Sequence, residues 1–170
     1  IDDKSLEKYP VLVEALEYAQ NEDKNIHFLG LLSDGGVHAH LDHLESLLEM
    51  SSKYSGPRVF VHGFTDGRDV DPKSGSGYIQ NLSQKLKSTG AKIASITGRY
   101  YAMDRDKRWD RVKKAYDALV HGRGAATHNL IESIEKSYDT GVTDEFIEPL
   151  IAVDEQNQPL TKINDGDVVI

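Results

Sequence analysis

The 170-residue chain contains no cysteine, which excludes disulfides, thiolate metal sites and a cysteine nucleophile. It also lacks any apolar run close to the roughly 20 residues that a membrane-spanning helix needs. Residues 1–10 lack the basic and apolar regions of a secretory signal peptide. From these absences we expect a cytoplasmic protein with no membrane partner.

Positive charge is outnumbered, because 20 Lys and Arg residues stand against 28 Asp and Glu residues and give a formal net charge of -8. This balance argues against nucleic acid as a partner, although a local group of arginines can still bind a small anion. The length favours one domain, residues 1–170, with room for a sizeable core. The chain has no initiator Met and stops in an apolar run, so we expect a fragment of a longer protein.

Strand-like and helix-like patterns alternate along the chain. Buried strands are predicted at 26–32, 58–64 and 91–97, and further strands at 149–154 and 166–170. Helices are predicted at 10–20, from 41, from 79 to Gly90, at 109–120 and from 130 to 138. Their apolar stripes include Trp109, Val112, Tyr116, Leu119 and Val120. The alternation predicts a three-layer α/β fold, with a mostly parallel sheet and helices on both faces.

Unusual polar chemistry follows each of the first three predicted strands. The loops are 33–40 (SDGGVHAH), 65–77 (TDGRDVDPKSGSG) and 98–108 (GRYYAMDRDKR). Ligands of open α/β sheets bind beyond the carboxyl ends of the strands. Because parallel strands end at the same edge, we expect these loops to form one pocket.

The first loop has a structural and a functional interpretation. Gly35 and Gly36 are typical of a tight turn that caps the next helix, but they also allow close approach of a ligand. His38 can donate to a phosphate or carboxylate, or carry a proton. A zinc site from Asp34, His38 and His40 matches no known metal spacing.

The other two loops are rich in arginine. Arg68 and Asp69 are adjacent, and they are either an exposed ion pair or a ligand-binding fork beside a carboxylate base. Arg99 is expected at the end of a strand, and Arg105 at or near the next helix start. A cation at that place opposes the helix dipole, and an anion bound between the two would explain it. Arg108 is interpreted as a solvated helix residue. A pocket of this kind complements a small, doubly anionic, hydroxylated molecule.

Three long segments carry a specific resemblance. GLLSDGGVHAHLDHL, VFVHGFTDGRDVDP and SITGRYYAMDRDKRWDRVKKAYDALVHGRG resemble the cofactor-independent (2,3-bisphosphoglycerate-independent) phosphoglycerate mutases. The match covers nearly the whole chain, but only the inserted substrate-binding, or phosphotransferase, domain of that two-domain family. Ala39 stands where serine is commoner.

The resemblance implies an isomerase of glycolysis and gluconeogenesis that interconverts 3-phosphoglycerate and 2-phosphoglycerate. The family uses a serine and two Mn²⁺ (or similar divalent) ions on an alkaline-phosphatase-like domain that is missing here, so no metal ligand is expected in this chain. Matched by motif, His38, Arg68, Asp69, Arg99 and Arg105 contact the substrate. Asp69 is the expected catalytic base for the accepting hydroxyl.

Several family elements are absent from these residues. They are the serine nucleophile, its Asp/His metal cluster, a further arginine pair and a lysine, so we expect the isolated chain to be inactive. We expect a monomer. Two alternatives remain, a stand-alone binding module for small phosphorylated hydroxy acids and an α/β domain whose charged loops only cap helices.

Overall fold

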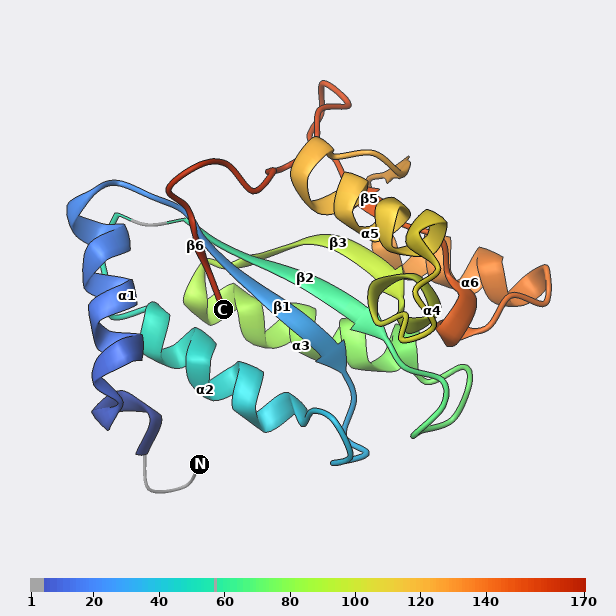
Figure 1. The fold of residues 1–170 in the computed structure, drawn as a ribbon, viewed down its shortest axis with the longest axis horizontal. Coiled ribbons are helices and arrows are strands. Elements are labelled where there is room, and N and C mark those ends of the chain that lie inside the picture. The colour runs from blue at the N-terminus through green and yellow to red at the C-terminus, as the bar shows by residue number, and fades with distance from the viewer. Residues whose placement is uncertain (1–4, 57) are drawn as a thin grey trace.

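The computed structural model describes residues 5–56 and 58–170 as helices packed on a central sheet (Figure 1). The strands are β1 (Ile26–Leu32), β2 (Val59–Thr65), β3 (Lys92–Gly98), β4 (Ala125–Thr127), β5 (Leu150–Ala152) and β6 (Val168–Val169). Their order across the sheet is β4-β5-β3-β2-β1-β6. All neighbours are parallel except β3 and β5. The mostly parallel sheet is therefore confirmed.

Residues at the helix ends explain where several helices begin or end. They are α1 (Pro10–Asn21), α2 (Leu41–Ser51), α3 (Gly75–Thr89), α4 (Arg99–Ala102), α5 (Trp109–His121) and α6 (Leu130–Asp139), with 3₁₀ turns η1 (Ser5–Lys8) and η2 (Asp144–Phe146). Pro10 opens α1, where its missing N–H costs nothing. Gly90 ends α3 with a φ of 74°, and Asn129 caps α6.

Helices cover both faces of the sheet. In Figure 1, α3 and α6 lie behind the strands, and α4 and α5 lie in front of β3 and β5. None of the described helices is both long and apolar enough to cross a membrane.

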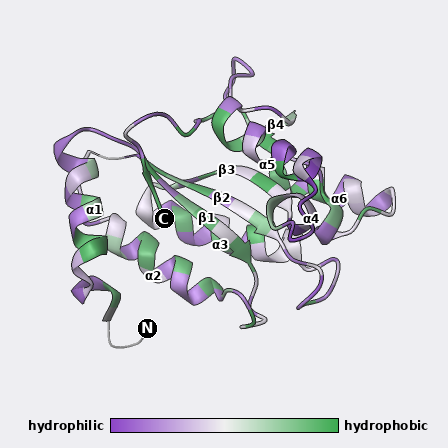
Figure 2. Cartoon of the chain, viewed as in Figure 1, coloured by the Kyte–Doolittle hydropathy of each residue, from purple (hydrophilic) through white to green (hydrophobic). Residues whose placement is uncertain are grey.

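The main core lies on the α3 side of the sheet. Alternate residues of each strand point to this side, and the apolar stripes of the helices pack on them. Figure 2 shows hydrophobic residues along the strands in green. Its fully buried members include Leu16, Ile26, Val61, Ile79, Leu82, Ile96 and Ile134. A smaller cluster of Ala118, Ile151 and Val153 lies under α5. The core therefore holds β1, β2 and β3 in place from one side.

Several expectations are wrong in detail. Trp109 is 71% exposed and Tyr116 is 55% exposed, although both were predicted to lie on the apolar face of their helix. The helix instead buries Ala115 and Ala118, whose small side chains allow close packing on the sheet. The strand at 150–152 is antiparallel to β3, and α4, β4 and η2 were not predicted.

Candidate functional site

The three polar loops meet at one edge of the sheet, as the parallel order requires. Leu32 is in register with Thr65, and Thr65 is in register with Gly98, so β1, β2 and β3 end side by side. A pocket of about 390 Å³ opens there. Its lining comprises His38, Arg68, Asp69, Arg99, Tyr100, Met103, Asp104, Arg105, Asp106, Arg111 and Glu145. All five residues named from the sequence lie in this set.

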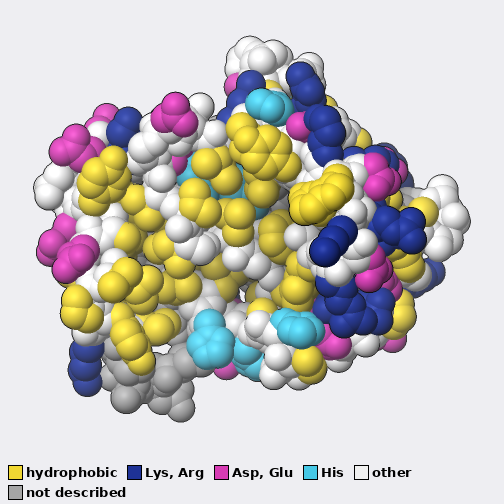
Figure 3. Space-filling model, in the orientation of Figure 1, with side chains coloured by type: hydrophobic (Ala, Val, Ile, Leu, Met, Phe, Trp, Pro, Cys, Tyr) yellow, Lys and Arg dark blue, Asp and Glu magenta, His cyan; other side chains and the backbone are white. Residues whose placement is uncertain are grey.

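Charged side chains dominate this end of the molecule. Figure 3 shows dark blue Lys and Arg beside magenta Asp and Glu at the right, where α4 lies in Figure 1. The pocket lining contains four arginines together with acids. The local charge is therefore mixed, in contrast to the net charge of -8 for the whole chain.

Arg99 is the most buried cation of the pocket, with a side chain 11% exposed. Its Nη1 donates to Asp66 Oδ1 at 2.5 Å and to Asp69 Oδ2 at 2.7 Å. Burial acts to lower the pKa of Arg99, but the hydrogen bonds to Asp69 and Asp66 outweigh it and the pKa is raised. The guanidinium is thus a permanent charge in a fixed position.

The remaining predicted residues are less constrained. His38 Nε2 lies 3.9 Å from Asp69 Oδ2, and the His38 side chain is 52% exposed. Arg68 Nη1 donates to Glu145 Oε1 at 3.1 Å. Arg105 is exposed, and it has no ion-pair partner in the described part of the chain. These side chains can therefore reorient toward a ligand at little cost.

Arg105, expected at or near the next helix start, lies four residues before the first residue of that helix. Helix α5 begins at Trp109, and α4 together with an irregular segment fills the space after β3. Arg105 consequently lies in a loop, so the argument from an opposed helix dipole does not apply to it. Arg108 stands at the N-cap position of α5 without a side-chain cap, and its backbone N–H donates to Asp104 Oδ2.

Further pocket residues were not found from the sequence. Arg111 donates to Asp104 and stacks on the Tyr100 ring, with Cζ 3.7 Å from the ring centroid. This stacking holds α4 against the first turn of α5. Neither pairing gave a local signal, because Asp104 lies outside α5, seven positions before Arg111, and Glu145 reaches Arg68 from 77 residues away.

Turn η2 packs against the end of β3, next to the pocket. Asp144 is fully buried, and its carboxylate accepts from the Gly75 N–H at 2.8 Å and from the Tyr138 hydroxyl. Burial, the largest influence, raises the pKa of Asp144. A Cβ on Gly98 would collide with the backbone of Glu145 and Ile147. The close packing of η2 on the end of β3 therefore requires glycine.

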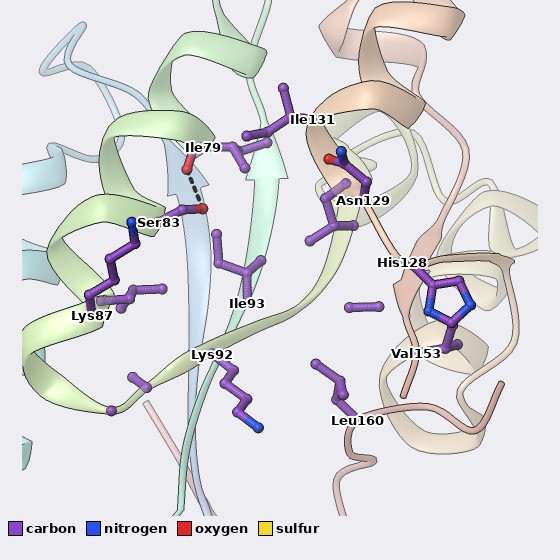
Figure 4. Close-up of a pocket in the computed structure, with 15 residues that line it drawn as sticks. Ile79, Ser83, Lys87, Lys92, Ile93, His128, Asn129, Ile131, Val153 and Leu160 are labelled. Atoms are coloured by element: carbon purple, nitrogen blue, oxygen red, sulfur yellow. Dashed lines mark hydrogen bonds between the residues drawn. The ribbon is translucent and has the colours of Figure 1, made fainter. Parts of the chain in front are cut away.

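A second hollow of about 460 Å³ lies away from these loops (Figure 4). It is lined mainly by aliphatic side chains such as Ile79, Ile93 and Leu160, with Lys87, Lys92 and His128 among them. This hollow holds no carboxylate and only one side chain suited to proton transfer. The charged pocket, by contrast, has both carboxylates and a histidine in its lining. No group of three or more His, Cys, Asp or Glu residues within 5–56 and 58–170 is arranged to hold a metal ion.

Known proteins match the whole chain. The family model described as BPG-independent PGAM N-terminus covers residues 1–170. The 2,3-bisphosphoglycerate-independent phosphoglycerate mutase of Flavobacterium johnsoniae is 57% identical over 167 residues, which are 98% of this chain and 33% of that protein. The enzyme of the same name from Parabacteroides distasonis is 54% identical over 161 residues, 95% of this chain and 32% of that protein.

A solved structure matches the fold. It is a crystal structure of Leishmania mexicana phosphoglycerate mutase at low cobalt concentration, with a TM-score of 0.87 and 34% identity. The match covers 98% of this chain and 33% of that one. The chain thus spans about a third of the length of the relatives it matches.

Proposed function

The chain belongs to the family of BPG-independent phosphoglycerate mutase N-terminal domains, and we propose that it holds glycerate and phosphoglycerate while the rest of a longer enzyme transfers the phosphoryl group. The reaction is the interconversion of 3-phosphoglycerate and 2-phosphoglycerate. The observation that carries the proposal is the convergence of His38, Arg68, Asp69, Arg99 and Arg105 in one pocket.

The arginines are proposed to bind the anionic groups. A guanidinium matches carboxylate and phosphate oxygens with two parallel hydrogen bonds. Arg99 is held in place by its two acids, so its remaining N–H groups keep one orientation. Arg68 and Arg105 are exposed enough to close on a ligand, and His38 is placed to donate to it.

Asp69 is proposed as the base for the hydroxyl that accepts the phosphoryl group. That hydroxyl loses its proton as the new O–P bond forms, and a carboxylate within hydrogen-bond reach can take it. The Asp69 side chain is 22% exposed and faces the pocket, so a ligand can reach it. In the same step the O–P bond to the phosphorylated nucleophile of the enzyme breaks, and the oxygen of that nucleophile is the leaving group.

The nucleophile and the metals are assigned to other parts of the longer protein. The described residues do not fit a divalent metal ion, since no suitable group of ligands is present among them. We therefore propose that a serine and two Mn²⁺ or similar ions lie on an alkaline-phosphatase-like domain joined to this one. We also propose that the whole enzyme is a cytoplasmic monomer.

The test has two arms. In the first, 3-phosphoglycerate is titrated into the ¹⁵N-labelled chain, and we expect shifts at residues 33–40, 65–77 and 98–108 with a Kd near millimolar as an order of magnitude. Lactate, which lacks both the phosphate and the oxygen at C3, is the control. Shifts confined to the second hollow would contradict the proposed site.

In the second arm, activity is measured with and without manganese. We expect turnover from the full-length protein and none from the 170-residue chain, because the chain lacks a phosphoryl-transfer centre. Ligand binding combined with an inactive full-length protein would favour the stand-alone binding module instead. Turnover by the isolated chain would contradict the proposal that another part of the longer protein transfers the phosphoryl group.

A further inference from the structure

The three loops of the pocket meet on one buried carboxylate, Asp66, which follows β2 directly and has a side chain 1% exposed. Its Oδ1 accepts from the backbone N–H groups of Arg68 and Asp69, each at 3.2 Å, and from Arg99 at 2.5 Å. The Ser33 hydroxyl, from the first loop, is near enough to lower the pKa of this carboxyl. Asp66 therefore touches residues of all three loops.

Asp66 is ionised at neutral pH in this position. Burial, the largest influence, raises the pKa of Asp66, but hydrogen bonds from Arg99, the Asp69 N–H, Ser33 and the Arg68 N–H together lower it. Within the described residues its second oxygen, Oδ2, is buried without a hydrogen bond of good geometry. The carboxylate thus depends strongly on the Arg99 charge for compensation.

The two acids that share Arg99 Nη1 differ in exposure. The side chain of Asp66 is 1% exposed, whereas that of Asp69 is 22% exposed. Separating Asp66 from the guanidinium would leave a buried charge unpaired, which is costly. Asp69 can exchange Arg99 for water or for a ligand hydroxyl at a much smaller cost. An entering ligand therefore displaces the contact between Asp69 and Arg99 and leaves the contact between Asp66 and Arg99 intact.

We infer that Asp66 is a positioning residue that keeps Arg99 in place and balances its charge, so that Asp69 can turn from the guanidinium to the ligand hydroxyl. The inference rests on the proposed function. Without the Asp66 charge, Arg99 would attract Asp69 alone and would hold it more strongly. Removal of the hydroxyl proton would become slower, while anion binding by the arginines would continue.

The test is Asp66→Asn in the full-length enzyme that contains this chain. Asparagine keeps an oxygen for the two backbone N–H groups but removes the charge. We expect kcat to fall about tenfold while KM for 3-phosphoglycerate changes less than about threefold. Asp117→Asn is the control, because Asp117 is also paired with a cation, Lys113, but lies outside the pocket. It should leave both constants unchanged.

A double-mutant cycle separates this role from a merely structural one. If Asp66 acts through Arg99, the losses in kcat from Asp66→Asn and Arg99→Lys will not multiply in the double variant. Independent losses, a change in KM alone, or a wild-type kcat in Asp66→Asn would each overturn the inference. An inactive wild-type enzyme would instead count against the proposed function.

A second variant keeps the inference testable if Asp66→Asn does not fold. Arg99→Met in the 170-residue chain leaves Asp66 buried without its cation, which raises the pKa of that carboxyl in the folded variant. The folded variant then binds a proton that the unfolded chain does not, so acid favours it. We expect its melting temperature to be well below that of the wild type at pH 7. The gap between the two melting temperatures should be smaller at pH 5. A gap that stays constant would refute the pairing.

Discussion

Nδ1 of His27 lies 2.9 Å from Nε2 of His62. Both rings are buried, on the face of the sheet opposite the main core. Asp167 Oδ2, which only accepts, lies 3.3 Å from His27 Nε2, so that nitrogen carries the proton. His27 Nδ1 must then accept from His62 Nε2–H. His62 Nδ1 in turn accepts from the Ser95 hydroxyl at 2.7 Å. The tautomers of both rings follow from this chain of hydrogen bonds.

The network ties the C-terminal strand to the sheet. Asp167 also accepts from the N–H groups of Asn25 and Asn164, and Val168 pairs with β1 directly after it. Burial, the largest influence, and the neighbouring His27 together lower the pKa of His62 to about 3. Burial also lowers the pKa of His27, against the effect of Asp167. Both rings are therefore neutral in the folded protein.

The first prediction is a loss of stability in mild acid. Both folded-state pKa values lie below the unfolded value of about 6.5, so the unfolded chain binds protons first as the pH falls. Stability is therefore present above about pH 6.5 and decreases below it. We expect His62 alone to lower the free energy of unfolding by about 2 kcal/mol between pH 7 and pH 5. Urea unfolding at the two pH values measures this.

Two variants check the source of that effect. His62→Gln should lower stability at pH 7 and weaken its pH dependence, whereas His121→Gln, at an exposed histidine of α5, should leave the dependence unchanged. An equal pH dependence in His62→Gln and wild type would show that the acid sensitivity comes from other groups.

The second prediction concerns Asp69 as the base. Asp69→Asn preserves size and polarity but removes the proton acceptor, so isomerisation by the full-length enzyme should fall roughly a hundredfold or more. Slow release of inorganic phosphate should persist, because the substitution leaves the proposed phosphoserine half of the reaction untouched. Both products are followed in one assay. Isomerisation near the wild-type rate would show that Asp69 only positions Arg99 or the ligand.

The third prediction concerns the shape of the cation at position 99. Arg99→Lys keeps the charge, but an ammonium cannot reproduce the planar fork or serve two acids and a ligand at once. In the full-length enzyme we expect KM to rise and kcat to fall, each by about tenfold. Arg123→Lys, on the exposed surface after α5, is the control. Unchanged constants in Arg99→Lys would make Arg99 a structural residue only.

The fourth prediction concerns the support beneath the pocket. Gly98→Ala places a methyl group against the backbone of η2, so we expect a loss of about 2 kcal/mol or more in unfolding free energy. Ligand binding should weaken as well, because Glu145 and Arg99 both adjoin this position. Gly77→Ala is the matched control, since it meets nothing within 4 Å and lies inside α3. That variant should gain up to about 1 kcal/mol.

The sequence by itself determined the α/β class, the β1–β3 core of the sheet and the edge at which its polar loops gather. These features depend on local periodicity and on a general rule for parallel strands, so residues 26–32 were placed correctly and 58–64 and 91–97 to within one residue. The motifs around Arg68 and Arg99 also indicated the family, which the comparisons then showed.

The tertiary structure decided how the side chains at that edge are paired. Glu145 reaches Arg68 from 77 positions away, and Asp66 meets Arg99 from 33 positions away, so neither contact follows from local spacing. The exposure of Trp109 was also decided by packing, because small alanines fit the narrow space under α5 better than an indole. Long-range contacts depend on how whole elements dock, and short-range patterns do not encode that docking.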